Sequence, residues 1–421
     1  MLVIRTSVRR RLMKAAVPLL ITACGFGAVM LPSLMGMYGT IGSDEDYELR
    51  YCGIENMNED EPVLLEISHK AESEQLVPEV STQEQDDPKF VTENVTVAEN
   101  VNTETVESTS DFPGKYLTTV NLSDETEDLT LFTLHSGHIY EETFGKANGP
   151  EYTDLPGGGQ LRNCTDIPDE TVRYELGKDS VTGVTLFSDE PQVLIIHTHT
   201  TESYEPYTKD WYDERYTSRS FDPDYSVVAV GDAIAEQLAE AGISVIHDCT
   251  VHDAVYSGAY SRSLGTTLTE MERYPSIKIV LDIHRDAIEY SDGSRVSAVT
   301  MIDGKKAAQV MLICAADDGT YGVPGFFDNL RFASELQQSM ESLFPTLTRP
   351  ILFQYCQYNQ QVSPGALLIE VGSHGNSIEQ ATYSGELIGR SLAAMLARDE
   401  SEPEAVQVFA GMPRYFLDRV R

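Results

Sequence analysis

The chain has 421 residues and a formal net charge of −37, from 67 acidic and 30 basic residues. That length allows one catalytic domain with further segments around it. The strong negative charge repels phosphate backbones, so it argues against a nucleic-acid-binding protein. A hydrophobic content of 41% excludes both a wholly disordered chain and a polytopic membrane protein.

The N-terminal segment carries basic residues and no acidic ones. Its five bases lie between Arg5 and Lys14, and residues 15–43 are uncharged. Because this uncharged stretch exceeds the roughly 20 residues that cross a bilayer, we predict a transmembrane anchor over 15–43. The basic flank predicts that residues 1–14 form a cytoplasmic tail and that the rest of the chain lies outside the cell membrane. A cleaved signal peptide, or a lipoprotein modified at Cys24, is the alternative.

An acidic segment follows the predicted anchor. Residues 44–128 contain 24 acidic and four basic residues and show no sustained hydrophobic periodicity. Such a segment buries little apolar surface and repels itself, so we predict a largely disordered, extended linker. We expect residues 129–188 to form an N-terminal extension of the catalytic region, 189–400 the catalytic domain, and 401–421 a C-terminal tail.

Short apolar runs alternate with helical periodicity in the region 189–400. The runs at 193–196, 243–246, 277–281 and 367–369 predict strands that are buried on both faces. Apolar spacing predicts one helix that ends before Gly242 and another that begins after Ser377, where Ser377 and Gln380 form a capping box. The alternation predicts an α/β domain in which helices flank a central, mostly parallel sheet, with the functional site at the carboxyl ends of its strands.

Histidines and carboxylates gather where three of these strands end. The ends read His197–Glu202, Asp282–Asp286 and Glu370–His374. His197 and His199 share a face if their strand continues, so either could ligate a metal ion. Imidazole and carboxylate are normal zinc ligands, and a catalytic zinc site uses three protein ligands and one open position. A further carboxylate can then carry the proton in an amide hydrolysis.

Each of these residues also has a structural interpretation. A histidine at a strand end can be a hydrogen-bonded core residue, Glu370 can form an ion pair with Arg285, and His374 can be a polar loop residue. A serine or cysteine nucleophile is less favoured, because the chain has no Gly-x-Ser-x-Gly turn. An aromatic cluster follows the first motif and is either a substrate wall or ordinary packing; it comprises Tyr204, Tyr207, Trp211, Tyr212 and Tyr216.

Three motifs, in this order, resemble those of the stage II sporulation protein P family. They are His197–Tyr204, Leu281–Asp286 and Ser363–Asn376, and the resemblance covers about residues 190–400. The basic N-terminus, single span and acidic spacer fit the layout of that family. Its fold is similar to that of zinc-dependent N-acetylmuramoyl-L-alanine amidases, so the resemblance implies a Rossmann-like amidase fold.

The resemblance implies a membrane-anchored peptidoglycan hydrolase of endospore formation. Such an enzyme cleaves the amide between muramic acid and L-alanine, with an additional endopeptidase action on cross-links, and thins the septal wall during engulfment of the forespore. It also implies the stage II sporulation proteins D and M as partners, and a single-pass location in the cell membrane at the septum between mother cell and forespore. A non-catalytic wall-binding scaffold and a zinc peptidase that cuts only stem peptides are the alternative functions.

Matching the motifs assigns roles to individual residues. The resemblance implies that His199 and His284 ligate zinc, with His197 as the alternate to His199, and that Glu370 is the catalytic acid and base. The third ligand is Glu202 or, as the alternate, Asp222. Arg285 is expected to orient a carboxylate of the stem peptide.

Overall fold

The computed structural model describes residues 37–39, 49–51, 104–107, 112–120, 129–180 and 183–398. The predicted cytoplasmic tail, most of the predicted anchor and linker, and the C-terminal tail lie outside these residues. Within the described ranges, no helix has both the length and the apolar character needed to cross a membrane. Met37–Gly39, at the end of the predicted anchor, is a short strand.

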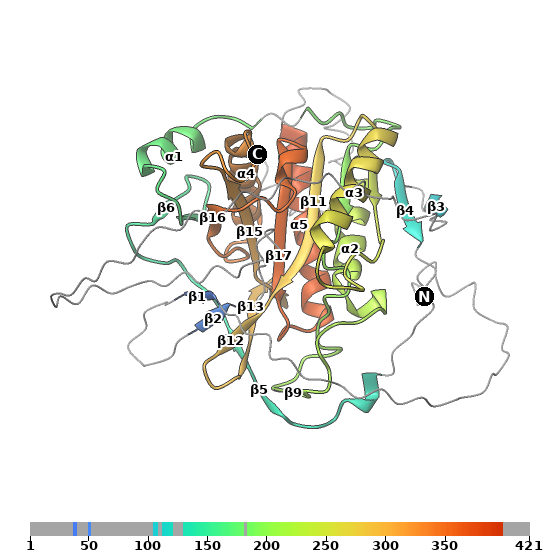
Figure 1. The fold of residues 1–421 in the computed structure, drawn as a ribbon, viewed down its shortest axis with the longest axis vertical. Helices are drawn as coiled ribbons and strands as arrows, with labels where there is room; N and C mark the ends of the chain where they lie inside the picture. Colours follow the sequence, from blue (N-terminus) through green and yellow to red (C-terminus); the bar gives the residue numbers. More distant parts are fainter. Residues whose placement is uncertain are drawn as a thin grey trace, which may run out of the picture. The chain divides into compact units, whose positions relative to one another are not determined.

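A ten-stranded sheet forms the centre of the fold (Figure 1). Its strand order is β3-β4-β10-β8-β11-β17-β15-β16-β7-β6. Six neighbouring pairs are parallel and three are antiparallel, so the prediction of an α/β domain with a mostly parallel sheet is confirmed. The strands are β3 (Glu104–Glu107), β4 (Tyr116–Val120), β6 (Tyr152–Asp154), β7 (Gln160–Asn163), β8 (Val193–Ile196), β10 (Val245–His247), β11 (Ile279–Asp286), β15 (Val310–Ala316), β16 (Ile351–Tyr355) and β17 (Gly365–Ser373).

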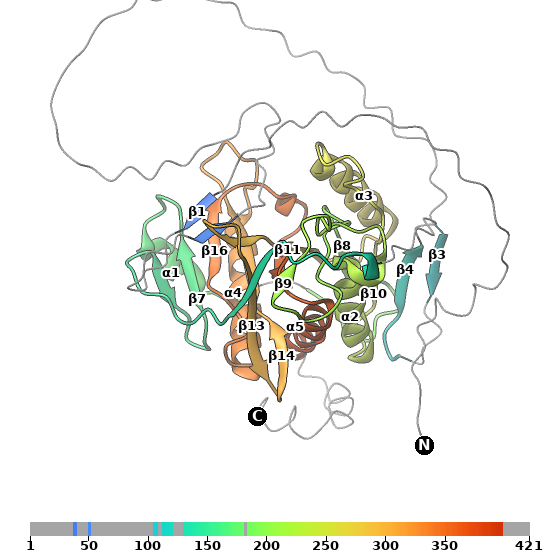
Figure 2. The same ribbon diagram turned by 90° about the horizontal axis from the view of Figure 1, so that it is seen from below.

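Helices cover both faces of this sheet (Figure 2). One face packs against α2 (Val227–Glu240), α4 (Phe326–Leu343) and α5 (Ile378–Arg398), and the other against α3 (Ala259–Arg273). The short helix α1 (Asp169–Leu176) lies against α4. Successive strand residues therefore enter different cores: Ile195 packs with the α2 residue Ile234, whereas Ile196 packs with the α3 residue Met271.

The predicted helix ends agree with the observed ones. Ser226 caps α2 through a 3.3 Å hydrogen bond from the N–H of Val228, and Gly242 follows the helix at a φ of +82°. At the start of α5, Ser377 Oγ accepts from the N–H of Gln380 and Gln380 Oε1 accepts from the N–H of Ser377, at 3.4 and 3.2 Å. The predicted capping box is confirmed.

A second, smaller sheet extends from the end of β11 that carries the site. Its order is β1-β2-β12-β13-β5-β9, and β14 pairs with β13. The strand β12 begins two residues after β11 ends, which places this sheet beside the functional residues. The strands are β1 (Met37–Gly39), β2 (Leu49–Tyr51), β5 (Gly137–Glu142), β9 (Trp211–Tyr212), β12 (Ile288–Tyr290), β13 (Arg295–Ile302) and β14 (Lys305–Ala308); the 3-10 helices are η2 (Leu129–Leu131), η3 (Pro223–Tyr225) and η4 (Gln360–Val362).

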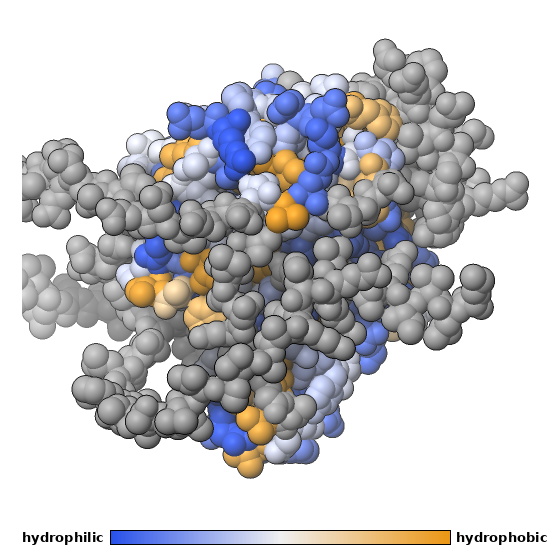
Figure 3. All heavy atoms as spheres, turned by 90° about the vertical axis from the view of Figure 1, so that its right-hand side faces the viewer, coloured by the Kyte–Doolittle hydropathy of each residue, from blue (hydrophilic) through white to orange (hydrophobic). Residues whose placement is uncertain are grey.

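The structure corrects the extent of the predicted linker. Strands β3 and β4 fall inside residues 44–128, yet β4 pairs in parallel with β10 and β3 pairs with β4. The Tyr116 hydroxyl donates to Asp232 of α2, and the N–H of Gly114 donates to the carbonyl oxygen of Ala239. Because these contacts come from residues far along the chain, the local composition does not reveal them. Where coloured atoms are visible on the face drawn in Figure 3, hydrophilic side chains are mixed with separate hydrophobic patches.

Candidate active site

His284 and Glu370 are neighbours on adjacent strands. The parallel register of β11 and β17 pairs these two residues. Val280 packs in the core on the α3 side of the sheet, and Leu368 packs with Tyr260 of α3. Because side chains alternate along a strand, His284 and Glu370 also face α3. The sheet therefore presents an imidazole and a carboxylate side by side at one edge.

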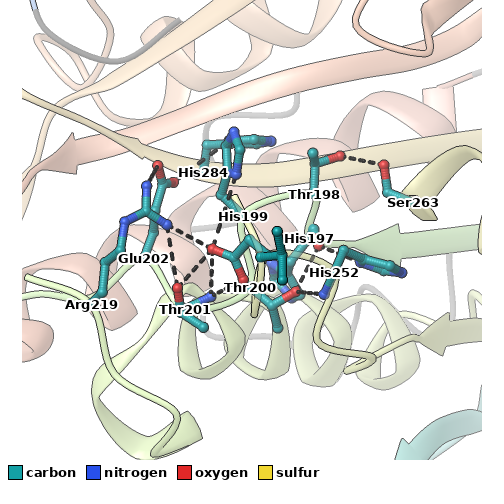
Figure 4. A network of polar contacts seen from close by, with 12 residues as sticks. His197, Thr198, His199, Thr200, Thr201, Glu202, Arg219, His252, Ser263 and His284 are labelled. Atoms are coloured by element: carbon teal, nitrogen blue, oxygen red, sulfur yellow. Dashed lines mark hydrogen bonds and ion pairs between the residues drawn. The ribbon is translucent and has the colours of Figure 1, made fainter. Parts of the chain in front are cut away.

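The two histidines of the first motif do not share a face. Strand β8 ends at Ile196, and His197 points toward α2, where its Nε2 lies 2.8 Å from His247 Nε2 and its Nδ1 lies 3.0 Å from the carbonyl oxygen of Ile283. His199 lies within a turn, and its ring is perpendicular to that of His284, with 5.4 Å between ring centroids. The expectation of a common face is therefore wrong, because the strand does not continue. His199, and not its alternate His197, lies with His284 (Figure 4).

Glu202 lies with the two histidines. One carboxylate oxygen, Oε2, is 3.6 Å from His284 Nδ1 and accepts a 3.1 Å hydrogen bond from the N–H of Arg285. Burial alone would raise the pKa of Glu202, but the charges of Arg285 and His284 outweigh it and lower that pKa well below its ordinary range. The alternate, Asp222, instead caps η3 by accepting the N–H of Asp224 at 3.0 Å.

Asp282 supports His284 from the other side of its ring. Asp282 Oδ1 lies 2.9 Å from His284 Nε2, and Asp282 accepts hydrogen bonds from the N–H and the hydroxyl of Thr198 at 2.8 and 2.6 Å. Burial would lower the pKa of His284, but Asp282 and Glu202 together raise it well above its ordinary value. The Asp-x-His spacing on one strand is the sequence signal for this pair.

Glu370 is a buried carboxylate whose Oε2 has no hydrogen-bond partner. Burial, followed by the charge of Asp286, raises its pKa to about 8. The alternative ion pair with Arg285 does not form, since that guanidinium donates to the carbonyl oxygens of Ser203, Ser218 and Asp286 at 3.0–3.2 Å. These contacts favour a positioning role for Arg285, and its expected contact with a substrate carboxylate stays a prediction.

Loops add residues that the sequence did not single out. Tyr256 stacks on His199 with 4.7 Å between ring centroids, and the Arg219 guanidinium carbon lies 4.8 Å from the centre of the Tyr256 ring. Arg219 Nη1 is 2.7 Å from Asp253 Oδ2, and Tyr260 of α3 meets His199 edge to face. Only tertiary contacts place these loop residues, so no local pattern marks them.

The aromatic cluster is divided between core and surface. Tyr204 and Tyr216 are buried, and their hydroxyls donate to the carbonyl oxygen of Val371 and to Ser203 Oγ. Trp211 stacks on the ring of His135 with 4.0 Å between centroids. Packing, the second interpretation, therefore accounts for the buried tyrosines.

The side chains of His199, Glu202, His284 and Glu370 form a buried cluster. The cluster offers donors that suit a metal ion, although it is not a preformed metal site. Among the described residues, no three His, Cys, Asp or Glu side chains are arranged as a site that could hold a metal ion. However, His199 Nδ1 is buried and has no hydrogen-bond partner, an arrangement that costs about 1–3 kcal/mol unless a cation or ligand satisfies it. Asp282 holds Nε2 of His284, which leaves Nδ1 of that ring on the side of Glu202. Burial lowers the pKa of His199 to about 4, which keeps its ring in the neutral form that binds metals. Two imidazoles and the Glu202 carboxylate fit the chemistry of zinc.

Comparisons with known proteins place the chain in a family. The family model described as Stage II sporulation protein P (SpoIIP) matches residues 44–393. The stage II sporulation protein P of Bacillus subtilis (strain 168) is 24% identical over 288 residues, which cover 63% of this chain and 68% of that protein.

Solved structures of amidases are more distant. The N-acetylmuramoyl-L-alanine amidase from Clostridium difficile 630 is 16% identical. Its alignment covers 51% of this chain and 100% of that one, with a TM-score of 0.29. The CwlD amidase from Clostridioides difficile, solved in complex with the GerS lipoprotein, is 13% identical. Its alignment covers 49% of this chain and 97% of that one, with a TM-score of 0.30. Similarities at this level carry no argument. The family model, in contrast, spans most of the chain and all three motifs, and the chain therefore belongs to the stage II sporulation protein P family.

Proposed function

We propose that this protein is a peptidoglycan hydrolase of endospore formation that cleaves the amide between muramic acid and L-alanine. One observation carries the proposal: His199, Glu202 and His284 lie together at the edge of the sheet, beside a buried carboxylate, Glu370, that has an unpaired oxygen. Membership of the sporulation family supports the biological setting.

His199, Glu202 and His284 would hold a zinc ion, which when bound supplies Lewis acidity toward the amide carbonyl and an activated water. The protein's own contribution is to fix these three groups. Asp282 holds the ring of His284, and the N–H of Arg285 holds the carboxylate of Glu202. The guanidinium of Arg285 donates to main-chain carbonyl oxygens of Ser203 and Ser218, and these bonds help to fix the position of the neighbouring Glu202.

Glu370 carries the proton in this proposal. A carboxyl group whose pKa is about 8 can both accept and donate a proton near neutral pH. Glu370 would take a proton from the attacking water and deliver it to the departing nitrogen of L-alanine. The burial that raises the pKa of Glu370 also keeps bulk water from competing for this proton.

The remaining expectations complete the proposal. The domain would have the Rossmann-like amidase fold, with residues 15–43 as the membrane anchor and the catalytic domain outside the cell membrane. At the septum the enzyme would work with stage II sporulation proteins D and M, and would also act on cross-links. A wall-binding scaffold and a zinc peptidase remain alternatives. The unpaired, buried His199 Nδ1 and Glu370 Oε2 favour an enzyme over a scaffold, because a scaffold has no use for them.

Substitution of Glu370 tests the proton carrier. The full-length Glu370→Gln protein, purified in detergent, should retain its zinc content and release peptides from sacculi about 10²–10⁴-fold more slowly. Glu379→Gln is the matched control, because this carboxylate is exposed on α5. Elemental analysis gives the metal content, and amine release gives the rate. Wild-type turnover by Glu370→Gln would overturn the assigned role, and full activity after complete chelation would overturn the assignment of zinc.

A further inference from the structure

We infer that Arg219, at the rim of the site, binds a free carboxylate of the stem peptide and so selects among peptidoglycan substrates. The inference rests on the proposed function, because it names a group of the same substrate. In the described residues, four arginines contact the proposed ligands or acidic residues near them, namely Arg219, Arg285, Arg295 and Arg349, and their contacts differ. The structure assigns carboxylate recognition to Arg219 because it alone of the four combines solvent access with a fixed orientation.

The other three arginines are buried. Arg285 donates to main-chain carbonyl oxygens, Arg295 pairs with Glu205 at 3.3 Å, and Arg349 pairs with Asp286 at 2.9 Å. The side chain of Arg219, in contrast, is 32% exposed. A peptide that approaches the site from solvent can therefore reach this guanidinium without displacing a buried ion pair.

The hydrogen bonds that orient Arg219 come from one of its two terminal nitrogens. Among the described residues, its hydrogen bonds use Nη1, which donates to Asp253 Oδ2 at 2.7 Å and to Thr201 Oγ1 at 3.3 Å (Figure 4). Its Nη2 lies 3.9 Å from Glu202 Oε1, beyond hydrogen-bond distance, and the guanidinium lies over the ring of Tyr256. A guanidinium has five N–H donors in a planar fork, so donors remain for a carboxylate, which this fork binds with two parallel bonds.

The loop that orients Arg219 is itself fixed. Arg262 of α3 donates to the carbonyl oxygens of His252 and Ser257 at 2.6 and 3.0 Å, which ties down the segment that carries Asp253 and Tyr256. Tyr256 in turn stacks on His199. The ring of Tyr256 therefore lies between the guanidinium of Arg219 and the proposed zinc ligand His199. This distance between guanidinium and ligand suits a substrate whose carboxylate is a few bonds from the scissile amide.

Charge explains why such a residue is needed. The chain carries a net charge of −37, and the carboxylates of Glu202, Asp253 and Asp282 lie within the site. These negative charges repel a peptide with free carboxylates unless a nearby cation binds it. Arg219 is positioned to be that cation.

A binding experiment tests this inference independently of turnover. The parent is the full-length Glu370→Gln protein, in which cleavage is suppressed. The probes are two synthetic muramoyl peptides that differ only in the acidic residue after L-alanine, which carries a free carboxylate in one and a carboxamide in the other. Calorimetry should show the carboxylate peptide bound about tenfold more tightly, as expected for a charge-assisted bidentate contact.

Further variants assign that preference to Arg219. In the same parent, Arg219→Gln should bind both peptides equally, Arg219→Lys should restore part of the preference, and Arg273→Gln should keep all of it. Arg273 is a matched control, because it is a half-exposed arginine at the far end of α3. Equal binding of the two peptides by the parent, no binding of either, or a preference that survives Arg219→Gln would each overturn the inference.

The outcome is separable from that of the proposed function. If the wild-type protein fails to cleave the amide while the parent still prefers the carboxylate peptide, the proposed reaction fails and the Arg219 site stands. If cleavage occurs without the preference, only the Arg219 site fails.

Discussion

His374 shows how one buried side chain links folding to pH. Its Nε2 lies 3.0 Å from Glu289 Oε1, and its Nδ1 is buried without a partner. Burial lowers the pKa of His374 to about 4 from an ordinary value of 6.5. Between these values the unfolded chain binds a proton that the folded protein excludes. The stability contributed by the neutral ring is therefore complete above pH 6.5 and is lost as the pH falls toward 4.

We expect His374→Gln to have a shallower loss of stability than the wild-type protein between pH 6.5 and 4. The two slopes should differ by up to about 1.4 kcal/mol per pH unit, since that is the free energy of one proton per unit. Urea denaturation at several pH values measures the slopes. Parallel slopes would mean that His374 is not the group that titrates.

At the scale of the elements, α2 approaches the sheet at a glycine. A Cβ on Gly231 would lie 2.5 Å from His247 Nε2 and 2.9 Å from His197 Nε2. These rings cannot move freely, because His197 is bonded to the carbonyl oxygen of Ile283 and His247 to Asp232. We expect Gly231→Ala to lower the free energy of unfolding by about 1–3 kcal/mol, the usual effect of overpacking a core.

Gly265 of α3 is the matched control, because a Cβ there meets nothing within 4 Å. Gly265→Ala should raise the free energy of unfolding by about 0.5–1 kcal/mol, since alanine is the better helix former. Urea denaturation of both variants makes the comparison. A stabilised Gly231→Ala protein would show that the helix does not depend on this close approach.

The elements also show which parts of the site could be predicted. A strand buried on both faces reads as an apolar run, so the polar residues at its end stand out, as His284 and Glu370 do. The end of β8 could not be predicted, because the sequence from His197 to His199 alternates as a strand would. The turn is set instead by the hydroxyl of Thr198, which donates to Asp282 of β11 and shares a hydrogen bond with the hydroxyl of Ser263 of α3, both far along the chain.

Elements held by distant partners cannot be predicted from local sequence for the same physical reason. Strand β4 is a short threonine-containing segment that becomes regular only beside β10. Arg219, Asp253 and Tyr256 lie in loops, where neighbouring residues do not determine the side-chain positions. Local pattern therefore predicts the sheet and the polar residues at its strand ends, whereas the rim of the proposed site depends on tertiary contacts.

For the whole molecule, the family match extends from residue 44 to 393 and so includes the ten-stranded sheet and the proposed site. The negative charge is divided between the predicted linker and the rest of the chain. Residues 44–128 have 24 acidic against four basic residues, a net charge of −20 that leaves −17 for the rest of the chain. The chemistry is assigned to a few buried groups at one edge of the sheet, and Arg219 is the partly exposed cation beside them.

The products formed from purified sacculi test the central claim most directly. The full-length protein should release peptides that begin with L-alanine and leave glycan strands whose muramic acid carries no peptide, and mass spectrometry of the digest identifies both. Muropeptides that keep their peptide on the sugar and lose only their cross-links would contradict the amidase assignment in favour of a peptidase. Unchanged sacculi would contradict enzymatic function altogether and favour a wall-binding scaffold.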